Sequence, residues 1–296
     1  MKKTIYALGF FDGVHLGHQA LLHACCQLAQ KEDCHQAVAT FCDHPEALLR
    51  GQAPARISSD RDRRDLLFSY GIPMVMTQPF NRNLMQTPWE DYLLSFKNAQ
   101  FKNAGGFVCG SDFRFGAGGA GTAEKLAAWC AAEGLVCAIV PQQTLDGIRI
   151  SSTHIRNLLE TGNISEANRF LGHPHRMTGK VIHGKGLGHT LGIPTANMLV
   201  PEGTVSLPRG VYACQAMVSG VLYPAVTNIG LQPTVDGDTL TVESWLLDFE
   251  GDLYGKELTL LFHDFLRPEQ KFPGLEELQA EIRKNAGQTR KILEKS

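Results

Sequence analysis

The chain has 296 residues, which suits two domains better than a single core. Hydrophobic residues make up 43% and charged residues 20%, as in soluble globular proteins, and the net charge of −2 excludes the basic footprint of a nucleic-acid-binding protein. The N-terminal residues lead into a strand of about six residues, too short for a signal peptide or a membrane span, so we expect neither.

The eight cysteines indicate a reducing environment. They form no Cys-x-x-Cys pair and lie in apolar runs such as Cys25-Cys26 and residues 136–138. We therefore interpret them as reduced core residues and predict a cytoplasmic protein.

The first motif is a turn at residues 9–18, between a predicted strand and a predicted helix. Residues 4–8 are apolar, and apolar side chains recur at helical spacing over residues 19–32. Three glycines allow the backbone of such a turn to approach a ligand or to take positive φ: Gly9, Gly13 and Gly17.

His15 and His18 stand at the mouth of that helix, three residues apart. A helix N-terminus offers unpaired N–H groups and a partial positive charge, so both imidazoles could face one bound phosphate. A zinc site is excluded because no nearby cysteine or histidine supplies the further ligands. A Walker loop is excluded because the turn does not end in Gly-Lys-Ser/Thr. A glycine-rich turn with two locally bonded histidines is the remaining alternative, but the strand, the glycines and the helix entry favour phosphate binding.

Strands and helices alternate from the N-terminus to about residue 170. Apolar runs predict strands over residues 36–41, 72–77, 106–110 and 135–140. Helices are predicted over residues 59–70, with Ser59 as the cap, from residue 88, and over residues 122–133. This alternation predicts a parallel sheet with helices on both faces, which binds ligands beyond the carboxyl ends of its strands. The chemically suggestive residues all follow strands: His15, His18, Asp43, His44, Asp112 and Ser151 to Thr153.

The pattern changes after an interdomain joint predicted at residues 171–178, which gives domains at 1–171 and 178–296. Strand-like runs separated by turn residues cover residues 177–183, 210–218, 222–229, 240–249 and 257–262. Their spacing predicts a small closed β-barrel, with a terminal helix over residues 274–293 packed outside it.

Two features of the second half suggest chemistry. Thr195 and Asn197 are two residues apart, so on an extended chain both face one side and could hold a magnesium ion. Glu243 interrupts an otherwise apolar strand, where a carboxylate could take a proton from a substrate hydroxyl. A polar strand face and an outward-facing charge are the respective alternatives, and the residues alone leave both open.

Residues 9–18, Gly-Phe-Phe-Asp-Gly-Val-His-Leu-Gly-His, resemble the nucleotide-binding signature of prokaryotic FAD synthetases. These enzymes belong to the nucleotidyltransferase superfamily named for its His-Ile-Gly-His motif. The resemblance implies that His15 and His18 bind ATP phosphates and stabilise the transition state as pyrophosphate leaves. It also implies that the rest of the turn contacts nucleotide through Gly9, Phe11, Asp12, Gly13 and Gly17.

Three further segments extend this resemblance. Residues 40–45 are similar to a Thr-Phe-x-Pro-His-Pro motif, with Asp43 in place of proline. Residues 110–116 resemble a Gly-x-Asp-Phe-x-Phe-Gly loop, which implies that Asp112 contacts nucleotide and Phe113 contacts flavin. Residues 150–156 match Ile-Ser-Ser-Thr-x-Ile-Arg, a second phosphate clamp formed by Ser151, Ser152, Thr153 and Arg156.

The second half resembles riboflavin kinases. Residues 179–197 look like the kinase signature, which ends in Pro-Thr-Ala-Asn, and residues 228–234, 253–255 and 266–272 match further family motifs. The resemblance places magnesium on Thr195 and Asn197 and makes Glu243 the general base. It assigns the remaining contacts to Gly184, Gly186 and Gly188 for nucleotide, and to Asn228 and Arg267 for flavin.

Together the halves resemble the bacterial bifunctional riboflavin kinase/FAD synthetase family, with a Rossmann-like nucleotidyltransferase domain and a kinase β-barrel. Three positions depart from the family pattern. Trp245 replaces a histidine two residues after the base, His189 replaces an arginine, and Asn285 replaces an aspartate.

The resemblance implies two reactions that use ATP and Mg²⁺: riboflavin to FMN, and FMN to FAD with release of pyrophosphate. The expected partners are these small molecules, with no nucleic acid and no membrane, and the oligomeric state is open. One alternative is a flavin-binding regulatory protein with one inactive site. Another, an aminoacyl-tRNA synthetase fragment, is disfavoured because the chain has no basic stripe for tRNA.

Overall fold

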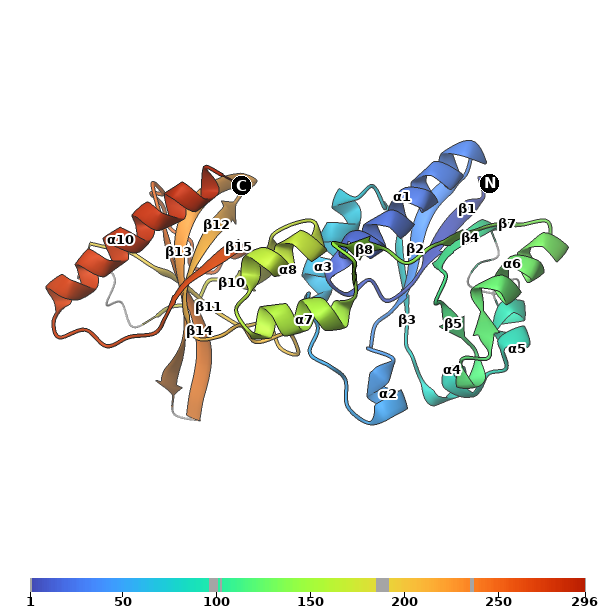
Figure 1. The fold of residues 1–296 in the computed structure, drawn as a ribbon, viewed down its shortest axis with the longest axis horizontal. Coiled ribbons are helices and arrows are strands. Elements are labelled where there is room, and N and C mark those ends of the chain that lie inside the picture. The colour runs from blue at the N-terminus through green and yellow to red at the C-terminus, as the bar shows by residue number, and fades with distance from the viewer. Residues whose placement is uncertain (1, 96–100, 102, 185–191, 235–236, 296) are drawn as a thin grey trace. The chain divides into compact units, whose positions relative to one another are not determined.

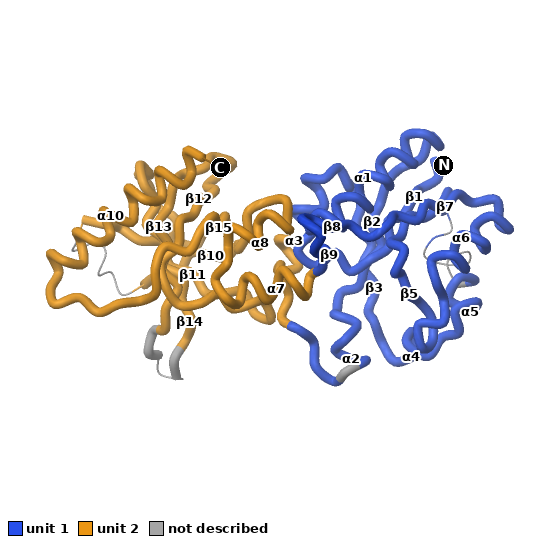
Figure 2. Tube along the Cα trace, viewed as in Figure 1, with its two compact units in different colours: residues 1–54, 63–151 blue, residues 55–62, 152–296 orange. Residues whose placement is uncertain are grey.

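The computed structural model describes residues 2–95, 101, 103–184, 192–234 and 237–295, which form two compact units (Figures 1 and 2). The first unit consists of Met1–Pro54 and Arg63–Ser151. The second consists of Ala55–Asp62 and Ser152–Ser296. A short segment of the N-terminal half therefore belongs to the second unit.

The first unit is built on a five-stranded parallel sheet in the order β3-β2-β1-β4-β7 (Figure 1). Its strands are β1 (Thr4–Leu8), β2 (His35–Phe41), β3 (Val75–Gln78), β4 (Ala104–Gly110) and β7 (Val136–Val140). All five overlap apolar runs of the sequence, because strands that are covered on both faces of a sheet carry apolar side chains on both faces. The predicted parallel sheet is confirmed.

Helices cover both faces of this sheet. The helices that precede residue 152 are α1 (Leu16–Lys31), α2 (Glu46–Arg50), α3 (Asp60–Ser69), α4 (Arg82–Gln86), α5 (Trp89–Ser95) and α6 (Ala123–Ala132), of which α1, α3, α5 and α6 supply the buried side chains that pack on the sheet. Alternate residues of β1 point to opposite faces, so Ile5 packs in a core with α1 and α3, while Tyr6 packs in a second core with α5 and α6. Short elements complete the unit: η1 (Asp12–Val14), η3 (Ala117–Gly119), and the strand pairs β5 (Arg114–Phe115) with β6 (Gly121–Thr122) and β8 (Thr144–Leu145) with β9 (Ile148–Arg149).

The second unit contains a six-stranded antiparallel sheet in the order β10-β15-β12-β13-β14-β11. The strands are β10 (His175–Lys180), β11 (Ala196–Leu199), β12 (Gly210–Val218), β13 (Val221–Thr234), β14 (Gly237–Leu246) and β15 (Glu257–Pro268). Just beyond β10, Ile182 bridges to Asn197 of β11, and its N–H donates to the Asn197 carbonyl at 2.8 Å. This bridge joins the two edges of the sheet, as the predicted barrel requires. The terminal helix α10 (Leu275–Leu293) packs on β12, β13 and β15.

Helices α7 (Ser152–Glu160) and α8 (Ile164–Leu171) also belong to the second unit. The Asn168 side chain of α8 donates to the Phe262 carbonyl at 2.8 Å and accepts from the His175 N–H at 2.7 Å. Packing therefore divides the chain after Ser151, N-terminal to the joint suggested at residues 171–178. The assignment of one activity to residues 1–171 and the other to residues 178–296 stays a prediction.

Asp62 anchors the segment of residues 55–62 in the second unit. Its carboxylate is 1% exposed and accepts from Ser59 Oγ, Arg176 Nε at 2.8 Å, and the Thr178 N–H at 3.1 Å. The hydroxyl of Thr178 donates to it as well. Ser59 accepts from the Asp62 N–H at 3.0 Å, which confirms its predicted role as the helix cap.

Replacing Asp62 by alanine should destabilise the second unit, although Asp62 lies in the N-terminal half of the sequence. Loss of one partner of a buried ion pair costs about 3–5 kcal/mol, because the other charge stays buried. Hydrogen exchange of the amides in β10 and β15 measures this opening free energy. The control is Asp60→Ala, which removes an ion pair between the exposed Asp60 and the half-buried Arg56, worth about 1 kcal/mol. Equal protection losses in both variants would contradict the anchoring role of Asp62.

Candidate active sites

A strained turn connects β1 to α1 in the first unit. Phe11, Gly13 and Val14 have φ angles of 60°, 75° and 41°, which only glycine adopts without cost. Phe11 and Val14 are fully buried in the core, and this packing holds them in the strained conformation. The family resemblance implies that Phe11 contacts nucleotide. Its side chain is buried, so any such contact would involve its backbone.

His15 caps the N-terminus of α1 and positions His18. His15 Nδ1 accepts from the His18 N–H at 3.3 Å, and the two rings stack with centroids 3.6 Å apart. Because Nδ1 accepts this hydrogen bond, the ring proton of that tautomer lies on Nε2. A Cβ at Gly17 would lie 3.2 Å from His15 Cε1, so glycine gives this ring its space.

The His18 ring is neutral in this environment. Burial lowers its pKa well below 6.5, and the nearby charges of His15 and Arg63 lower it further. Among the described residues, His18 Nδ1 is buried and has no hydrogen-bond partner. Unsatisfied buried polar atoms are rare, and a site completed by a ligand is one place where they occur.

An apolar cavity of about 430 Å³ lies at the predicted flavin loop of the first unit. It is lined mainly by aromatic and aliphatic side chains, among them Phe41, Phe80, Leu84, Tyr92 and Phe113. Phe113 stacks on Phe115 with centroids 5.6 Å apart, so its ring is held as part of the wall. Such a cavity suits a planar aromatic ligand.

Outside residues 9–18, the predicted residues of the nucleotidyltransferase half lie on other elements than His15 and His18. Asp112 is exposed and paired with Arg149 at 2.7 Å. Ser151 ends the first unit, whereas Ser152, Thr153 and Arg156 lie on α7 in the second. Arg156 Nε donates to the Ala55 carbonyl at 2.6 Å. A clamp that joins these residues to His15 and His18 stays a prediction.

In the second unit, five adjacent strands place one residue each in a single row. The row consists of Asn197 on β11, Glu243 on β14, Asn228 on β13, Val211 on β12 and Arg267 on β15. Directly opposite residues in antiparallel strands share a face and have Cβ atoms about 4.5–5.5 Å apart. Strand register therefore groups four residues that are far apart in the sequence and were each singled out there.

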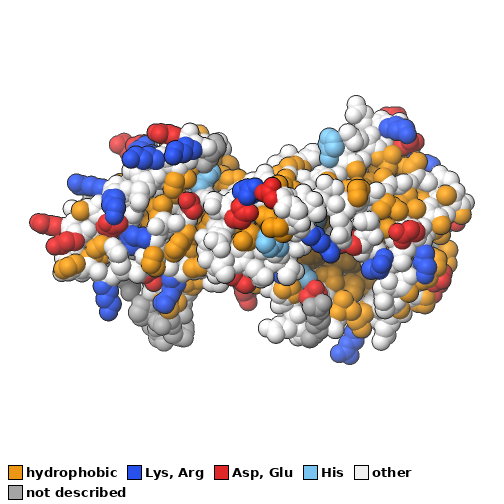
Figure 3. All heavy atoms as spheres, in the orientation of Figure 1, with side chains coloured by type: hydrophobic (Ala, Val, Ile, Leu, Met, Phe, Trp, Pro, Cys, Tyr) orange, Lys and Arg blue, Asp and Glu red, His pale blue; other side chains and the backbone are white. Residues whose placement is uncertain are grey.

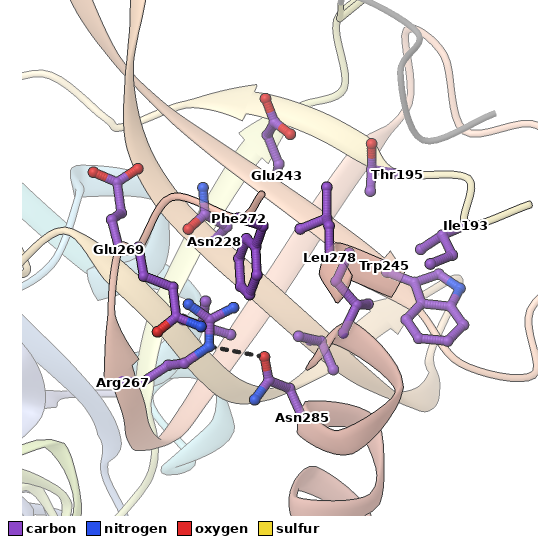
Figure 4. Close-up of a pocket in the computed structure, with 14 residues that line it drawn as sticks. Ile193, Thr195, Asn228, Glu243, Trp245, Arg267, Glu269, Phe272, Leu278 and Asn285 are labelled. Carbon is purple, nitrogen blue, oxygen red and sulfur yellow. Dashed lines mark hydrogen bonds between the residues drawn. The ribbon is translucent and has the colours of Figure 1, made fainter. Parts of the chain in front are cut away.

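A cavity of about 370 Å³ lies over this row (Figure 4). Thr195, Asn228, Glu243 and Arg267 line it, together with apolar side chains that include Ile193, Trp245, Phe272 and Leu278. Figure 4 shows Glu243 and Thr195 toward one end, and Arg267 bonded to Asn285 toward the other. The cavity thus combines a half-buried carboxylate at one end with apolar walls suited to an aromatic ring.

Asn197 presents a buried side-chain oxygen of the kind that binds metal ions. It is 7% exposed, and within the described residues its Oδ1 is buried without a hydrogen-bond partner. Gly184 covers it so closely that a Cβ there would lie 2.5 Å from Asn197 Nδ2. An oxygen ligand and a neighbouring hydroxyl on Thr195 fit magnesium, which prefers oxygen and keeps several waters.

A second cavity, of about 330 Å³, adjoins the first at Thr195, which lines both. Pro194, Phe249, Asp252 and Tyr254 are among its other lining residues. Gly186, Gly188 and His189, which the sequence singled out, lie outside the described residues.

Comparison with known proteins assigns both halves. Residues 1–154 match the FAD synthetase family model, and residues 171–293 match the riboflavin kinase model. A bifunctional riboflavin kinase/FMN adenylyltransferase from Listeria monocytogenes is 34% identical, over 99% of this chain and 93% of its own. The Escherichia coli K12 protein of that name is 36% identical, over 95% and 90% of the two chains.

The chain belongs to the bifunctional riboflavin kinase/FMN adenylyltransferase family. The FAD synthetase match contains His15, His18 and Ser151, and the riboflavin kinase match contains Thr195, Glu243 and Arg267. A crystal structure described as a macrolide-efflux protein from Streptococcus pneumoniae has a TM-score of 0.85 and 29% identity, over 98% of this chain and 94% of that one. That description stays with the Streptococcus protein. Among the residues that the structure describes, no helix combines the length and the hydrophobicity of a membrane span.

Sequence reasoning missed two arginines of the FAD synthetase half. Arg63 is 5% exposed, donates to the carbonyls of Phe10 at 2.9 Å and Phe41 at 3.1 Å, and thus ties the turn to the end of β2. Arg63 lies in the charged run Asp-Arg-Asp-Arg-Arg-Asp. Such runs are typical of solvated helix faces, so nothing in the sequence indicates that Arg63 is buried. Arg149, paired with Asp112, stands two residues before the Ser151 motif, and that spacing was the available signal.

Proposed function

We propose that the chain makes FMN and FAD in two separate sites. The second unit transfers the γ-phosphate of ATP to the 5′-hydroxyl of riboflavin, and the first transfers AMP from ATP to FMN with release of pyrophosphate. The observation that carries the proposal is the strand register that sets Glu243 between Asn197 and Asn228 beside an apolar cavity. Relatives that carry the bifunctional name match over nearly their whole length.

In the kinase reaction, Glu243 accepts the proton of the riboflavin hydroxyl as it attacks the γ-phosphorus. Asn228 and Arg267 orient the flavin in the cavity. The nucleotide contacts are assigned to Gly184 and, by the family resemblance alone, to Gly186 and Gly188. Thr195 and Asn197 would hold Mg²⁺. Once bound, the ion would neutralise charge on the nucleotide phosphates.

In the adenylyl transfer, the phosphate of FMN attacks the α-phosphorus of ATP. His15 donates from Nε2, and His18 supports the same phosphates, so both stabilise the charge that develops as pyrophosphate leaves. Phe113 and the apolar cavity hold the flavin ring. Asp112 contacts nucleotide, and Ser151 to Thr153 with Arg156 add the second phosphate clamp.

Mg²⁺ would serve as cofactor, and the expected partners are riboflavin, FMN and ATP, with no nucleic acid and no membrane. On the face shown in Figure 3, basic and acidic side chains are interspersed. A cytoplasmic location, expected from reduced cysteines, is also part of the proposal, and all eight cysteines are free thiols in the structure.

The decisive experiment supplies riboflavin, ATP and MgCl₂ and resolves FMN and FAD by chromatography over time. FMN should accumulate first and FAD should follow. A flavin-binding regulatory protein with one inactive site is the alternative; it would bind riboflavin but fail to form at least one product. FAD formation is then tested separately, with supplied FMN.

Asn197→Ala should raise the magnesium concentration that FMN formation requires by roughly tenfold or more, because the variant lacks one oxygen ligand and even the loss of a residue that orients a ligand costs about 10–100-fold in metal affinity. Asn197→Asp is the matched control, since it keeps both the shape and an oxygen and should retain magnesium. FMN formation is measured against MgCl₂ concentration at saturating ATP. The same magnesium dependence in wild type and Asn197→Ala would exclude Asn197 as a ligand.

A further inference from the structure

The C-terminal helix α10 forms one wall of the kinase cavity. Leu278, Ile282 and Asn285 line it, and their spacing of four and three residues puts them on one face of the helix. The opposite walls come from the sheet. The cavity therefore keeps its shape only if α10 stays seated on the strands.

Arg267 of β15 connects the sheet to this helix. Its Nε donates to Asn285 Oδ1 at 3.2 Å, drawn as a dashed line in Figure 4, and lies 3.6 Å from Glu281 Oε1. The Arg267 and Glu281 side chains are only 16% and 19% exposed, so solvent screens their attraction less than it screens a surface pair. Asn285 is neutral, and the negative charge at Arg267 comes from Glu281, one helical turn earlier.

Glu281 also orients Asn285. The amide of Asn285 is 1% exposed, and its Nδ2 donates to Glu281 Oε1 at 3.5 Å and Gln288 Oε1 at 3.2 Å. With its N–H groups directed to these acceptors, the amide must turn its oxygen toward Arg267. Glu281 itself is not a lining residue of the cavity. It contacts two of the polar residues that line the cavity, Arg267 and Asn285.

We propose that Glu281 is a positioning residue for flavin binding, which fixes Arg267 and Asn285 in the cavity and seats α10 against the sheet. The inference rests on the proposed kinase function and assigns a role to a residue that does not touch the substrate. Burial lowers the pKa of Arg267, and the charge of Glu281 opposes this shift, which agrees with their pairing.

The test is Glu281→Gln in the full chain, which keeps the side chain's size and removes its charge. The KM and the Kd for riboflavin should both rise by roughly tenfold, the effect of losing one charge-assisted hydrogen bond. The kcat for FMN formation should change less than about threefold, because Glu243 is untouched. Riboflavin fluorescence provides the Kd, and FAD formation from supplied FMN should stay at the wild-type rate.

Asp248→Asn is the matched control. Asp248 pairs with Arg290, also on α10, at 2.7 Å, but this exposed pair lies outside the cavity. Equal increases of the KM in both variants would overturn the specific role of Glu281, because loss of either ion pair of α10 would then have the same effect. An unchanged KM and Kd in Glu281→Gln would overturn it as well.

A rescue variant tests the charge itself. Asn285→Asp added to Glu281→Gln returns a carboxylate to Arg267 and should recover most of the riboflavin affinity. A double variant that binds no better than Glu281→Gln would contradict the proposal. Failure of the wild-type chain to form FMN would instead refute the kinase function. The activity assay of the wild-type chain shows this independently of the variants.

Discussion

His18→Ala is expected to abolish FAD formation and to leave FMN formation close to normal. The neutral His18 ring stacks on His15 at the N-terminus of α1, where it can stabilise charge on the departing pyrophosphate. Loss of one such group typically lowers the rate by on the order of 10²–10³-fold. Glu243 and its cavity belong to the other unit, so the kinase reaction should persist. The assay supplies FMN and ATP for one reaction, and riboflavin and ATP for the other.

His23→Ala is the control for this experiment, because His23 lies on the same helix and is exposed. It should leave both reactions unchanged. A thermal melt of His18→Ala shows whether the unit stays folded, since the variant also removes a ring in contact with Phe11. Equal loss of FMN and FAD formation in a folded variant would contradict the separation of the two sites.

Glu243→Gln is expected to stop FMN synthesis while riboflavin and ATP still bind. Glutamine keeps the shape of the side chain between Asn197 and Asn228 but cannot accept the hydroxyl proton. General base catalysis contributes roughly 10²–10⁴-fold, and that is the expected loss in kcat. The binding constants should change little, because the charge acts mainly as the hydroxyl attacks. FAD synthesis from supplied FMN should continue.

Glu257→Gln controls for the loss of one carboxylate from the second unit. Glu257 lies on β15, is exposed, and pairs with Arg61 rather than lining the cavity. Kinase activity should be unchanged in this variant. A Glu243→Gln enzyme with wild-type kcat would remove Glu243 from the mechanism and leave the reaction without a base.

Much of the fold could be predicted from hydrophobic pattern and turn residues. Apolar runs alternating with amphipathic segments predicted the parallel sheet, because strands buried on both faces must be apolar throughout. Strand β11 was not predicted as a strand, and β13 and β15 extend beyond their predicted ends at residues 229 and 262. Their missed portions carry polar residues such as Asn197 and Arg267, whose pairing depends on neighbouring strands and not on local composition.

The sequence by itself determined the local features of both sites. These are the strand-to-helix turn with its two histidines, and the extended stretch that carries Thr195 and Asn197. Local geometry follows from residues close in the chain, so these features needed no tertiary information. The family resemblance added Asn228 and Arg267 and favoured the role of general base for Glu243, which the residues alone had left open; all three roles stay predictions.

Only the tertiary structure decided which of these residues meet. Strand register places Asn197, Glu243, Asn228 and Arg267 in one row, although they are spread over about seventy residues of sequence. It also assigned residues 55–62 and helices α7 and α8 to the second unit, through Asp62 and Asn168. The physical reason is that buried polar groups must find partners, and those partners are chosen by the folded arrangement of strands and helices rather than by nearness along the chain.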